Sequence, residues 1–350
     1  MEGSISTRSS HAKMARHRDL IAGVGLAAIV SGIAVLLAPY MPKALPLPAM
    51  VIALILAIGL HALARNSLFQ PGLAFCAKPL LRWAVALLGM RVAIGDIINL
   101  GAPVAIMVMA SMAATIVTGI GIAKLLKQNV FFGMLVGSAT AVCGASAALA
   151  TSTVLPNYKG RDTDVAFVVV GVNLLATLAM LAYPPLCHYL GFDDKTTGVM
   201  LGGTIHDVAQ VVGAGYAISD TAGNAAAIVK LFRVFLLLPV VLILGFYVSQ
   251  VVGKREEARV AMPTFAIMFL VLCIINSICS SIPAIAESYH VVKSLTVGLS
   301  TWGLLLAISA IGLNTSIKAI TNLGWRHIVN LLGTTLIIVT LMTVGLLYIR

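Results

Sequence analysis

Long apolar stretches recur along almost the whole chain and limit what it can fold into. About twenty mostly apolar helical residues span the roughly 30 Å hydrocarbon core of a bilayer. Only 10% of the residues are charged and 60% are hydrophobic, whereas soluble domains have about 25% and about 45–50%. So few charges cannot cover a globule in water, and the alternating pattern of outer-membrane barrels is absent. The sequence therefore predicts an all-α, polytopic membrane protein.

We expect eleven transmembrane helices. A basic tail over 1–18 precedes the first, which lacks a clear cleavage site and is expected to remain uncleaved. Residues 19–350 then form one transmembrane transport domain, whose core contains two interrupted helices at about 130–154 and 198–218, the remainder being scaffold or panel. The expected spans cover about 20–40, 48–64, 79–97, 101–123, 130–150, 165–186, 198–217, 225–250, 263–282, 294–313 and 328–349.

The distribution of Lys and Arg predicts the orientation of these helices. The formal net charge is +11, but the basic residues form short clusters between apolar runs, which argues against a nucleic-acid partner. With eleven crossings and a cytoplasmic N-terminus, fifteen of them lie inside and five outside. This asymmetry follows the positive-inside rule and places the C-terminus outside, in the periplasm of a bacterial inner membrane.

Two parts of the chain resemble each other at an offset of 223 residues. The tripeptide Asn99-Leu100-Gly101 recurs as Asn322-Leu323-Gly324, with Gly89 matching Gly312. By the count of eleven, the two copies lie on opposite sides of the membrane, as an inverted-topology repeat requires. The alternative is a chance likeness between two helix-Gly-helix joints in a glycine-rich chain.

The fifth and seventh expected spans are rich in glycine and small polar residues. The fifth contains GSATAVCGASA, from Gly137 to Ala147, and the seventh contains GGTIHDVAQVVGAG, from Gly202 to Gly215. Unsatisfied backbone groups cost several kcal/mol in hydrocarbon, so we expect both helices to be interrupted and to direct free N–H groups toward an anion. The alternative for the fifth span is close helix packing through small residues.

Asp207 is the one acidic residue that this map places well inside a span. An intramembrane carboxylate is expensive and usually functional. His206 precedes it, and Gln210 follows three residues later on the same helix face. A hydrogen-bonded Asp–His pair that only fixes helix packing is the alternative.

Three basic residues lie more than one helical turn inside the expected spans: Arg91, Lys230 and Arg233. Lys230 and Arg233 lie three residues apart on one helix. They either snorkel to the outer interface or pair with Asp220, or supply a positive field to an anion path.

The chain lacks several common motifs of nucleotide-binding proteins and hydrolases. There is no phosphate-binding loop, HExxH or GxSxG pattern, and the five cysteines show no metal-ligand spacing. We therefore expect no cofactor and no enzymatic activity. An intramembrane enzyme that uses Cys143 or His206 stays as an alternative, although no triad partner is recognisable.

The two glycine-rich segments, with LLGMRVAI (Leu87 to Ile94) and AIGLNTSI (Ala310 to Ile317), resemble the bacterial YeiH family, also called UPF0324. The resemblance covers almost the whole chain. It implies an integral inner-membrane protein and a candidate exporter of sulfate or a related sulfur oxyanion. A more distant similarity to the bile-acid and arsenite transporter superfamily implies a core of crossed, broken helices beside a panel.

The leading hypothesis is a secondary transporter of a small anion in the lipid bilayer. Its coupling ion is H⁺, carried by His206 and Asp207, or Na⁺. A sodium-coupled organic-anion carrier and an anion channel are the alternatives. The protein could form a homodimer, which the sequence does not decide. The expected substrate-binding residues are Ser138, Thr140, Cys143, Gly144, Ser146, Thr204, Gln210 and Gly213, and the anion-path charges are Arg91, Lys230 and Arg233.

Overall fold

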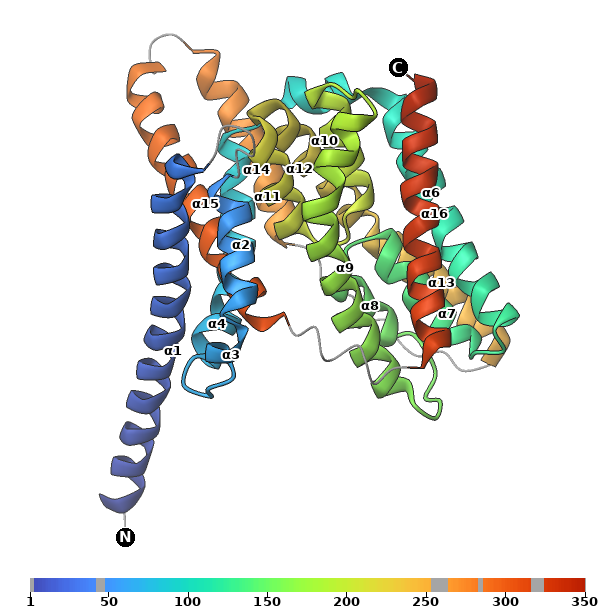
Figure 1. Ribbon diagram of the computed structural model, residues 1–350, viewed down its shortest axis with the longest axis horizontal. Coiled ribbons are helices and arrows are strands. Elements are labelled where there is room, and N and C mark those ends of the chain that lie inside the picture. Colours follow the sequence, from blue (N-terminus) through green and yellow to red (C-terminus); the bar gives the residue numbers. More distant parts are fainter. Residues whose placement is uncertain (1–2, 42–47, 253–263, 283–285, 316–323, 350) are drawn as a thin grey trace. The chain divides into compact units, whose positions relative to one another are not determined.

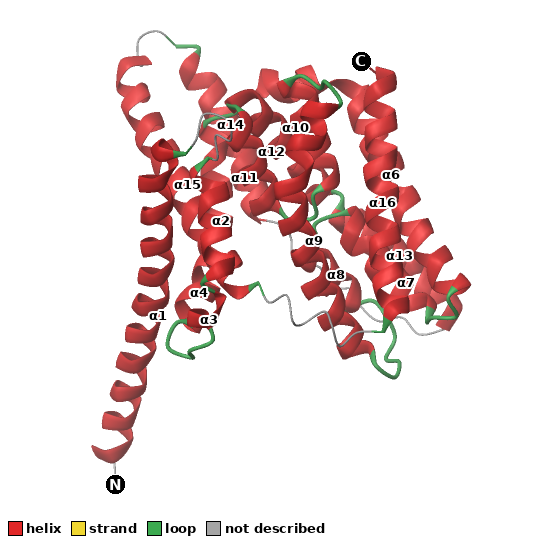
Figure 2. Cartoon of the chain, viewed as in Figure 1, coloured by secondary structure: helices red, strands yellow, loops and turns green. Residues whose placement is uncertain are grey.

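A computed structural model describes residues 3–41, 48–252, 264–282, 286–315 and 324–349. Within these ranges the chain consists of helices joined by loops, with no strand (Figure 2). It divides into two compact units. Unit 1 contains Met1–Arg91 and Met268–Ser316, and unit 2 contains Val92–Ile267 and Ile317–Arg350.

Unit 1 is a bundle of helices that approach closely at small residues. α1 packs against α2 and α4, and α15 packs against α2 and α5. A Cβ atom on Gly23 would lie 2.6 Å from the Cα of Gly72, so the backbones of α1 and α4 are in contact. The elements of the unit are α1 (Gly3–Leu37), η1 (Ala38–Tyr40), α2 (Ala49–Gly59), α3 (His61–Ala64), α4 (Gln70–Phe75), η2 (Cys76–Leu80), α5 (Leu81–Leu87), η3 (Leu88–Met90), α15 (Ala286–Asn314) and most of α14 (Thr264–Ser280).

The third expected span begins earlier than the sequence indicated. It was expected over 79–97, but one continuous helical rod runs over Gln70–Met90. Pro71 and Gly72 in its first turn and Pro79 inside it are residues that usually end helices. Pro71 lies in the first turn, where no N–H is needed, and a π-helical turn at Cys76–Leu80 accommodates Pro79.

Unit 2 contains both glycine-rich segments. α6 and α16 lie side by side (Figure 1), and α6 approaches α7 so closely that a Cβ on Gly137 would be 2.9 Å from the Cα of Ile116. The helices are α6 (Ile94–Leu125), α7 (Val130–Ala141), α8 (Ala145–Ser152), α9 (Arg161–Tyr189), α10 (Asp194–Thr204), α11 (Val208–Ile218), α12 (Asp220–Phe235), α13 (Leu237–Val252) and α16 (Trp325–Ile349).

The segment 130–154 is interrupted as expected, but the chain then turns back. Ser138 of α7 and Thr151 of α8 are hydrogen-bonded through their hydroxyls at 2.8 Å. In one straight rod of thirteen residues they would be about 20 Å apart. Phe131, which opens α7, also stacks with Tyr158 beyond the end of α8, with ring centroids 6.0 Å apart. α7 and α8 therefore form a helical hairpin whose two ends emerge together.

The segment 198–218 is a second hairpin. α10 and α12 run parallel, because Cβ atoms on Gly198 and Gly202 would lie 2.4 and 2.5 Å from the carbonyl oxygens of Ala222 and Ala226. α11 runs antiparallel to α12, since the two are joined at Ser219 and Tyr216 donates a 2.7 Å hydrogen bond to Asn224. α10 and α11 are therefore antiparallel to each other. The expected crossing of two broken but straight helices is replaced by two hairpins.

α16 shows that the hairpins meet tip to tip. Along α16, His327 contacts Phe132 near the base of α7, and Thr334 is 3.1 Å from Thr140 near its tip. Thr335 is then 3.1 Å from His206 at the second tip, and Thr343 lies 3.6 Å from Met200 on α10. Each of α7 and α10 is about 16–18 Å long, half the roughly 30 Å of a bilayer core. Two such helices that meet tip to tip therefore have together about the length of that core.

Helix is present in each of the eleven expected segments. Among the described residues, seven helices are long and apolar enough to cross a membrane, and four shorter apolar helices include α7 and α11. The count of eleven crossings stays a prediction, and the two glycine-rich segments that it counts as crossings turn back on themselves. The orientation of the termini stays a prediction, as does the division of 19–350 into core and scaffold. Asn322 and Leu323 of the expected repeat lie outside the described residues.

Candidate functional site

The turn of the first hairpin depends on Gly144. Val142 N donates to Ser138 O at 3.0 Å and Gly144 N donates to Ala139 O at 2.8 Å, which closes the end of α7. Gly144 has φ +64° and ψ −125°, a conformation that L-residues rarely adopt. α8 begins at the next residue, and no side chain caps its N-terminus. The expected break at Cys143 and Gly144 is therefore present, and it exposes the N–H groups of a helix start.

The turn of the second hairpin is made by Ile205, His206 and Asp207. Ile205 and Asp207 have extended backbones, with ψ of 136° and 148°. The carboxylate of Asp207 accepts a 2.9 Å hydrogen bond from Ala209 N, so Asp207 is the N-cap of α11. A Cβ on Gly144 would lie 3.4 Å from His206 O. The starts of α8 and α11 are therefore close neighbours.

Lys230 of α12 joins the two hairpin tips. Its Nζ donates to Val142 O at 2.8 Å, Ile205 O at 2.9 Å and His206 O at 2.6 Å. The side chain is fully buried. An ammonium group has three hydrogens, and each of them has a carbonyl acceptor here.

Arg233, one helical turn later, makes the same kind of connection. Nε and Nη2 donate to Ala141 O at 2.9 and 2.7 Å, and Nη1 donates to Gly202 O at 3.0 Å. Arg233 is also fully buried. The interpretation of Lys230 and Arg233 as snorkelling or paired with Asp220 is therefore wrong. They compensate the carbonyl ends of α7 and α10, where a helix dipole is negative.

His206 has a hydrogen-bond partner at each ring nitrogen. Nδ1 is 3.2 Å from Thr140 O, and Nε2 is 3.1 Å from Thr335 Oγ1. A carbonyl oxygen can only accept, so Nδ1 carries a hydrogen. The ring is buried against other groups at the tips and is thus one further link between the hairpins and α16.

Most of the expected substrate ligands are already occupied by the fold. Thr140 and Thr204 donate to Val136 O and Met200 O one turn earlier in their own helices, and Ser138 pairs with Thr151. Cys143 and Gly213 are buried. The three hydroxyls therefore have partners within the fold, and Cys143 and Gly213 are not accessible to a ligand in this structure.

Three expected residues remain available at the two helix starts. Ser146 in the first turn of α8 is exposed, and Asp207 keeps part of its surface accessible. Gln210 is buried; its Nε2 donates weakly to Thr177 Oγ1 at 3.4 Å, whereas its Oε1 has no partner. The start of α8 thus offers N–H groups that no side chain caps and the hydroxyl of Ser146, and the start of α11 offers a carboxyl group and an unsatisfied amide oxygen.

Arg91 belongs to unit 1, where it follows the helical run that ends at Met90, whereas the hairpin tips belong to unit 2. Its expected role in an anion path stays a prediction. Three further residues at the tips were not predicted from the sequence: Thr177, Thr334 and Thr335 contact Gln210, Thr140 and His206, respectively. Their one sequence signal is a hydroxyl in an otherwise apolar helix, which is too common to select them.

Comparisons with known proteins identify the family. The family model described as Conserved hypothetical protein 698 matches residues 22–331. UPF0324 membrane protein RB0971 of Rhizobium meliloti is 37% identical over 332 residues, 93% of each chain. The chain belongs to the UPF0324 membrane-protein family. It is also 40% identical to UPF0324 membrane protein TauZ of Paracoccus denitrificans, over 85% of this chain and 88% of TauZ, and 32% identical to UPF0324 inner membrane protein YeiH of Escherichia coli, over 88% and 89%.

Membership in UPF0324 confirms the expected resemblance to YeiH and makes this chain a membrane protein. The two segments that carried the resemblance, Gly137 to Ala147 and Gly202 to Gly215, are the two hairpin turns and their flanks. The family-like sequence therefore coincides with the part of unit 2 where helices are interrupted.

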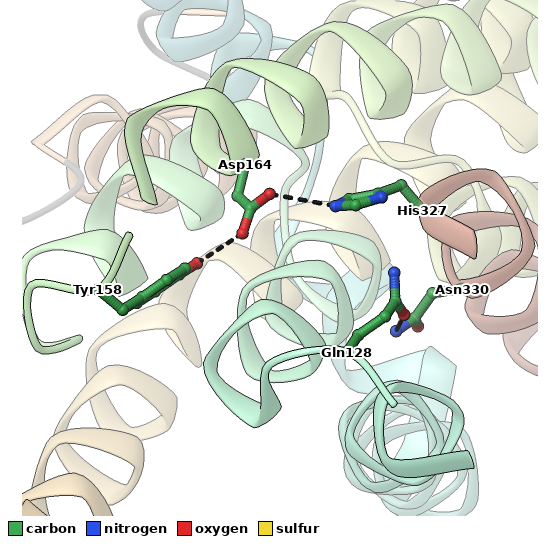
Figure 3. A network of polar contacts seen from close by, with 5 residues as sticks. All are labelled: Gln128, Tyr158, Asp164, His327 and Asn330. Atoms are coloured by element: carbon green, nitrogen blue, oxygen red, sulfur yellow. Dashed lines mark hydrogen bonds and ion pairs between the residues drawn. The ribbon is translucent and has the colours of Figure 1, made fainter. Parts of the chain in front are cut away.

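A second polar network in this UPF0324 protein fixes the base of the first hairpin (Figure 3). Asp164 of α9 accepts from Tyr158 at 3.0 Å and lies 3.2 Å from Nε2 of His327 on α16. Burial, and then the Asp164 carboxylate, raise the pKa of Tyr158 above its usual range, so its hydroxyl stays protonated and donates. In the same view Asn330 donates to Gln128 at 3.2 Å. The network joins the starts of α9 and α16 beside α7.

Proposed function

We propose that this UPF0324 protein is a secondary transporter of a small anion, such as sulfate or a related sulfur oxyanion. The observation that carries the proposal is the meeting of two re-entrant hairpins at two buried cations, Lys230 and Arg233. Re-entrant backbone persists at membrane depth only where protein buries it or where it lines a cavity. Neither Lys230 nor Arg233 forms an ion pair with a carboxylate among the described residues of the tips, and a buried positive charge without such a partner favours the binding of an anion.

The anion would bind at the starts of α8 and α11. The free N–H groups at Ala145 and Ser146 and the hydroxyl of Ser146 supply donors. Lys230 and Arg233 act through their field, because their hydrogens are already bonded to carbonyls. Asp207 repels an anion while it is ionised, so it carries a coupling proton or holds a coupling cation.

Uptake into proteoliposomes of purified full-length protein tests the proposal. We expect sulfate uptake that follows an imposed pH gradient. Ser146→Ala should weaken it, whereas Ser152→Ala, in the last turn of the same helix, should not. Uptake by Ser146→Ala equal to that of the wild type would remove the proposed site, and no uptake or binding of any sulfur oxyanion would remove the substrate class.

Sodium coupling is the second candidate, because the unsatisfied Oε1 of Gln210 and the carboxyl group of Asp207 are oxygen ligands in one helical turn. It predicts that the same uptake requires Na⁺ and is indifferent to the pH gradient. Turnover at single-channel rates in electrical recordings would instead indicate a channel.

A further inference from the structure

The groups that carry charge at the hairpin tips can be counted. Lys230 and Arg233 are counted as two positive charges, because the three Nζ hydrogens and the guanidinium all donate to backbone carbonyls, and Asp207 is counted as one negative charge when ionised. Two carbonyl ends, those of α7 and α10, and two amide ends, those of α8 and α11, meet there. Each helix end is equivalent to about half a charge, so these four cancel. The site therefore has a formal charge of one positive unit with Asp207 ionised and two with Asp207 protonated.

His206 is counted as neutral. Its Nδ1 donates to Thr140 O, and its Nε2 lies 3.1 Å from the hydroxyl of Thr335, which donates its own hydrogen to Leu331 O at 2.9 Å. The ring is fully buried, and a second ring proton would place a third positive charge in that buried space beside Lys230 and Arg233. The buried thiol of Cys143, which also faces Lys230, Arg233 and Asp207, is counted as neutral.

Asp207 is the group at the tips that can change its charge and is not fully buried. It keeps accessible surface, whereas Lys230, Arg233 and His206 are buried and hydrogen-bonded to the backbone. A protonated Asp207 still has a carbonyl oxygen that can accept from Ala209 N, so protonation leaves the cap of α11 in place.

An unbalanced charge near the middle of a bilayer is costly. From the charge count we propose that the site takes a monovalent anion without a proton and a divalent anion together with one proton, which is held by Asp207. This inference rests on the proposed function, since it names the valence rule of that same site. It also assigns the proton to Asp207 alone, and makes Lys230 and Arg233 positioning residues that set the fixed charge.

Proton uptake on ligand binding tests the rule. Purified full-length protein in weakly buffered detergent solution is mixed with sulfate, which is divalent at neutral pH, or with methanesulfonate, a monovalent tetrahedral analogue, and a pH-indicator dye records the change. We expect about one proton taken up per sulfate bound and none for methanesulfonate. Thermal stabilisation measures the binding of each anion independently.

Variants separate the possible results. Asp207→Asn keeps a side-chain cap for α11 and should bind sulfate with no proton uptake, whereas Asp162→Asn, on the exposed start of α9, should behave as the wild type. Sulfate binding to the wild type without proton uptake, equal uptake with both anions, or uptake retained in Asp207→Asn would overturn the inference and leave the proposed function standing. If neither anion stabilises the protein, the proposed function fails and this inference fails with it.

Discussion

Lys230 is the residue whose removal should disturb the hairpin tips most. Lys230→Met would leave the carbonyl oxygens of Val142, Ile205 and His206 without their donor in a buried place. Each unsatisfied buried group costs about 1–3 kcal/mol, so we expect the free energy of unfolding in detergent to fall by about 2–5 kcal/mol. The matched control is Lys159→Met, because Lys159 is exposed. Equal stability of the two variants would contradict the bridging role.

Gly144 provides a second test at the scale of one residue. Its φ of +64° and ψ of −125° are strained for any residue with a Cβ atom. Gly144→Ala should therefore lower the free energy of unfolding by about 1–3 kcal/mol. Gly95→Ala, at the start of α6 with no atom within 4 Å of the added Cβ, should be neutral or slightly stabilising. Unfolding of both variants in denaturant is the measurement, and an unchanged Gly144→Ala would show that the turn tolerates a side chain.

At the scale of elements, the position of α12 against α10 determines where the two cations lie. A Cβ on Gly202 would be 2.5 Å from Ala226 O, a backbone atom that cannot rotate away. Gly202→Ala should push α12 outward, weaken the bonds of Lys230 and Arg233, and destabilise the protein by about 1–3 kcal/mol. Gly121→Ala, near the C-terminal end of α6 with nothing within 4 Å of the added Cβ, is the control. Loss of anion binding in Gly202→Ala alone is the expected functional result.

The base of the first hairpin is held in part by a contact between α9 and α16. Nε2 of His327 lies 3.2 Å from the carboxylate of Asp164. In a double-mutant cycle of Asp164→Asn and His327→Gln, we expect a coupling energy of about 0.5–1 kcal/mol, which is usual for a partly exposed pair. A coupling energy near zero would show that the contact does not stabilise the base of the hairpin.

The two interruptions were predictable because their sequence conflicts with a lipid-facing helix. Glycines and hydroxyls around Cys143 and His206 mark both turns. The reversal of the chain in each segment was not predictable. The composition shows that the helix is interrupted and that its backbone groups need partners, but it does not show in which direction the chain continues. The spacing of Lys230 and Arg233 likewise places them on one face of α12 but does not say what that face meets. What this face of α12 contacts is set in part by residues more than eighty positions away in the sequence, as in the hydrogen bond between Arg233 and Ala141.

At the scale of the whole molecule, the hairpins change the side of the membrane on which two loops lie. If 130–154 and 198–218 do not cross, the loop with Lys159 and Arg161 moves inside and the loop with Lys195 moves outside. The fifteen inner and five outer basic residues of the eleven-span count then become sixteen and four, since two enter and one leaves. The positive-inside rule is followed more closely, and the N-terminus stays inside with the C-terminus outside.

Cysteine labelling distinguishes the two topologies. Single cysteines are introduced in place of the exposed Lys159 and Lys195, in a chain whose five native cysteines are replaced. A membrane-impermeant maleimide on spheroplasts should label Lys195→Cys at once and Lys159→Cys only after permeabilisation. Tyr40→Cys and Lys124→Cys lie outside and inside in both topologies and serve as controls. The reverse pattern would mean that both glycine-rich segments cross the bilayer, and it would contradict hairpins that meet at mid-membrane, together with the anion site built from their tips.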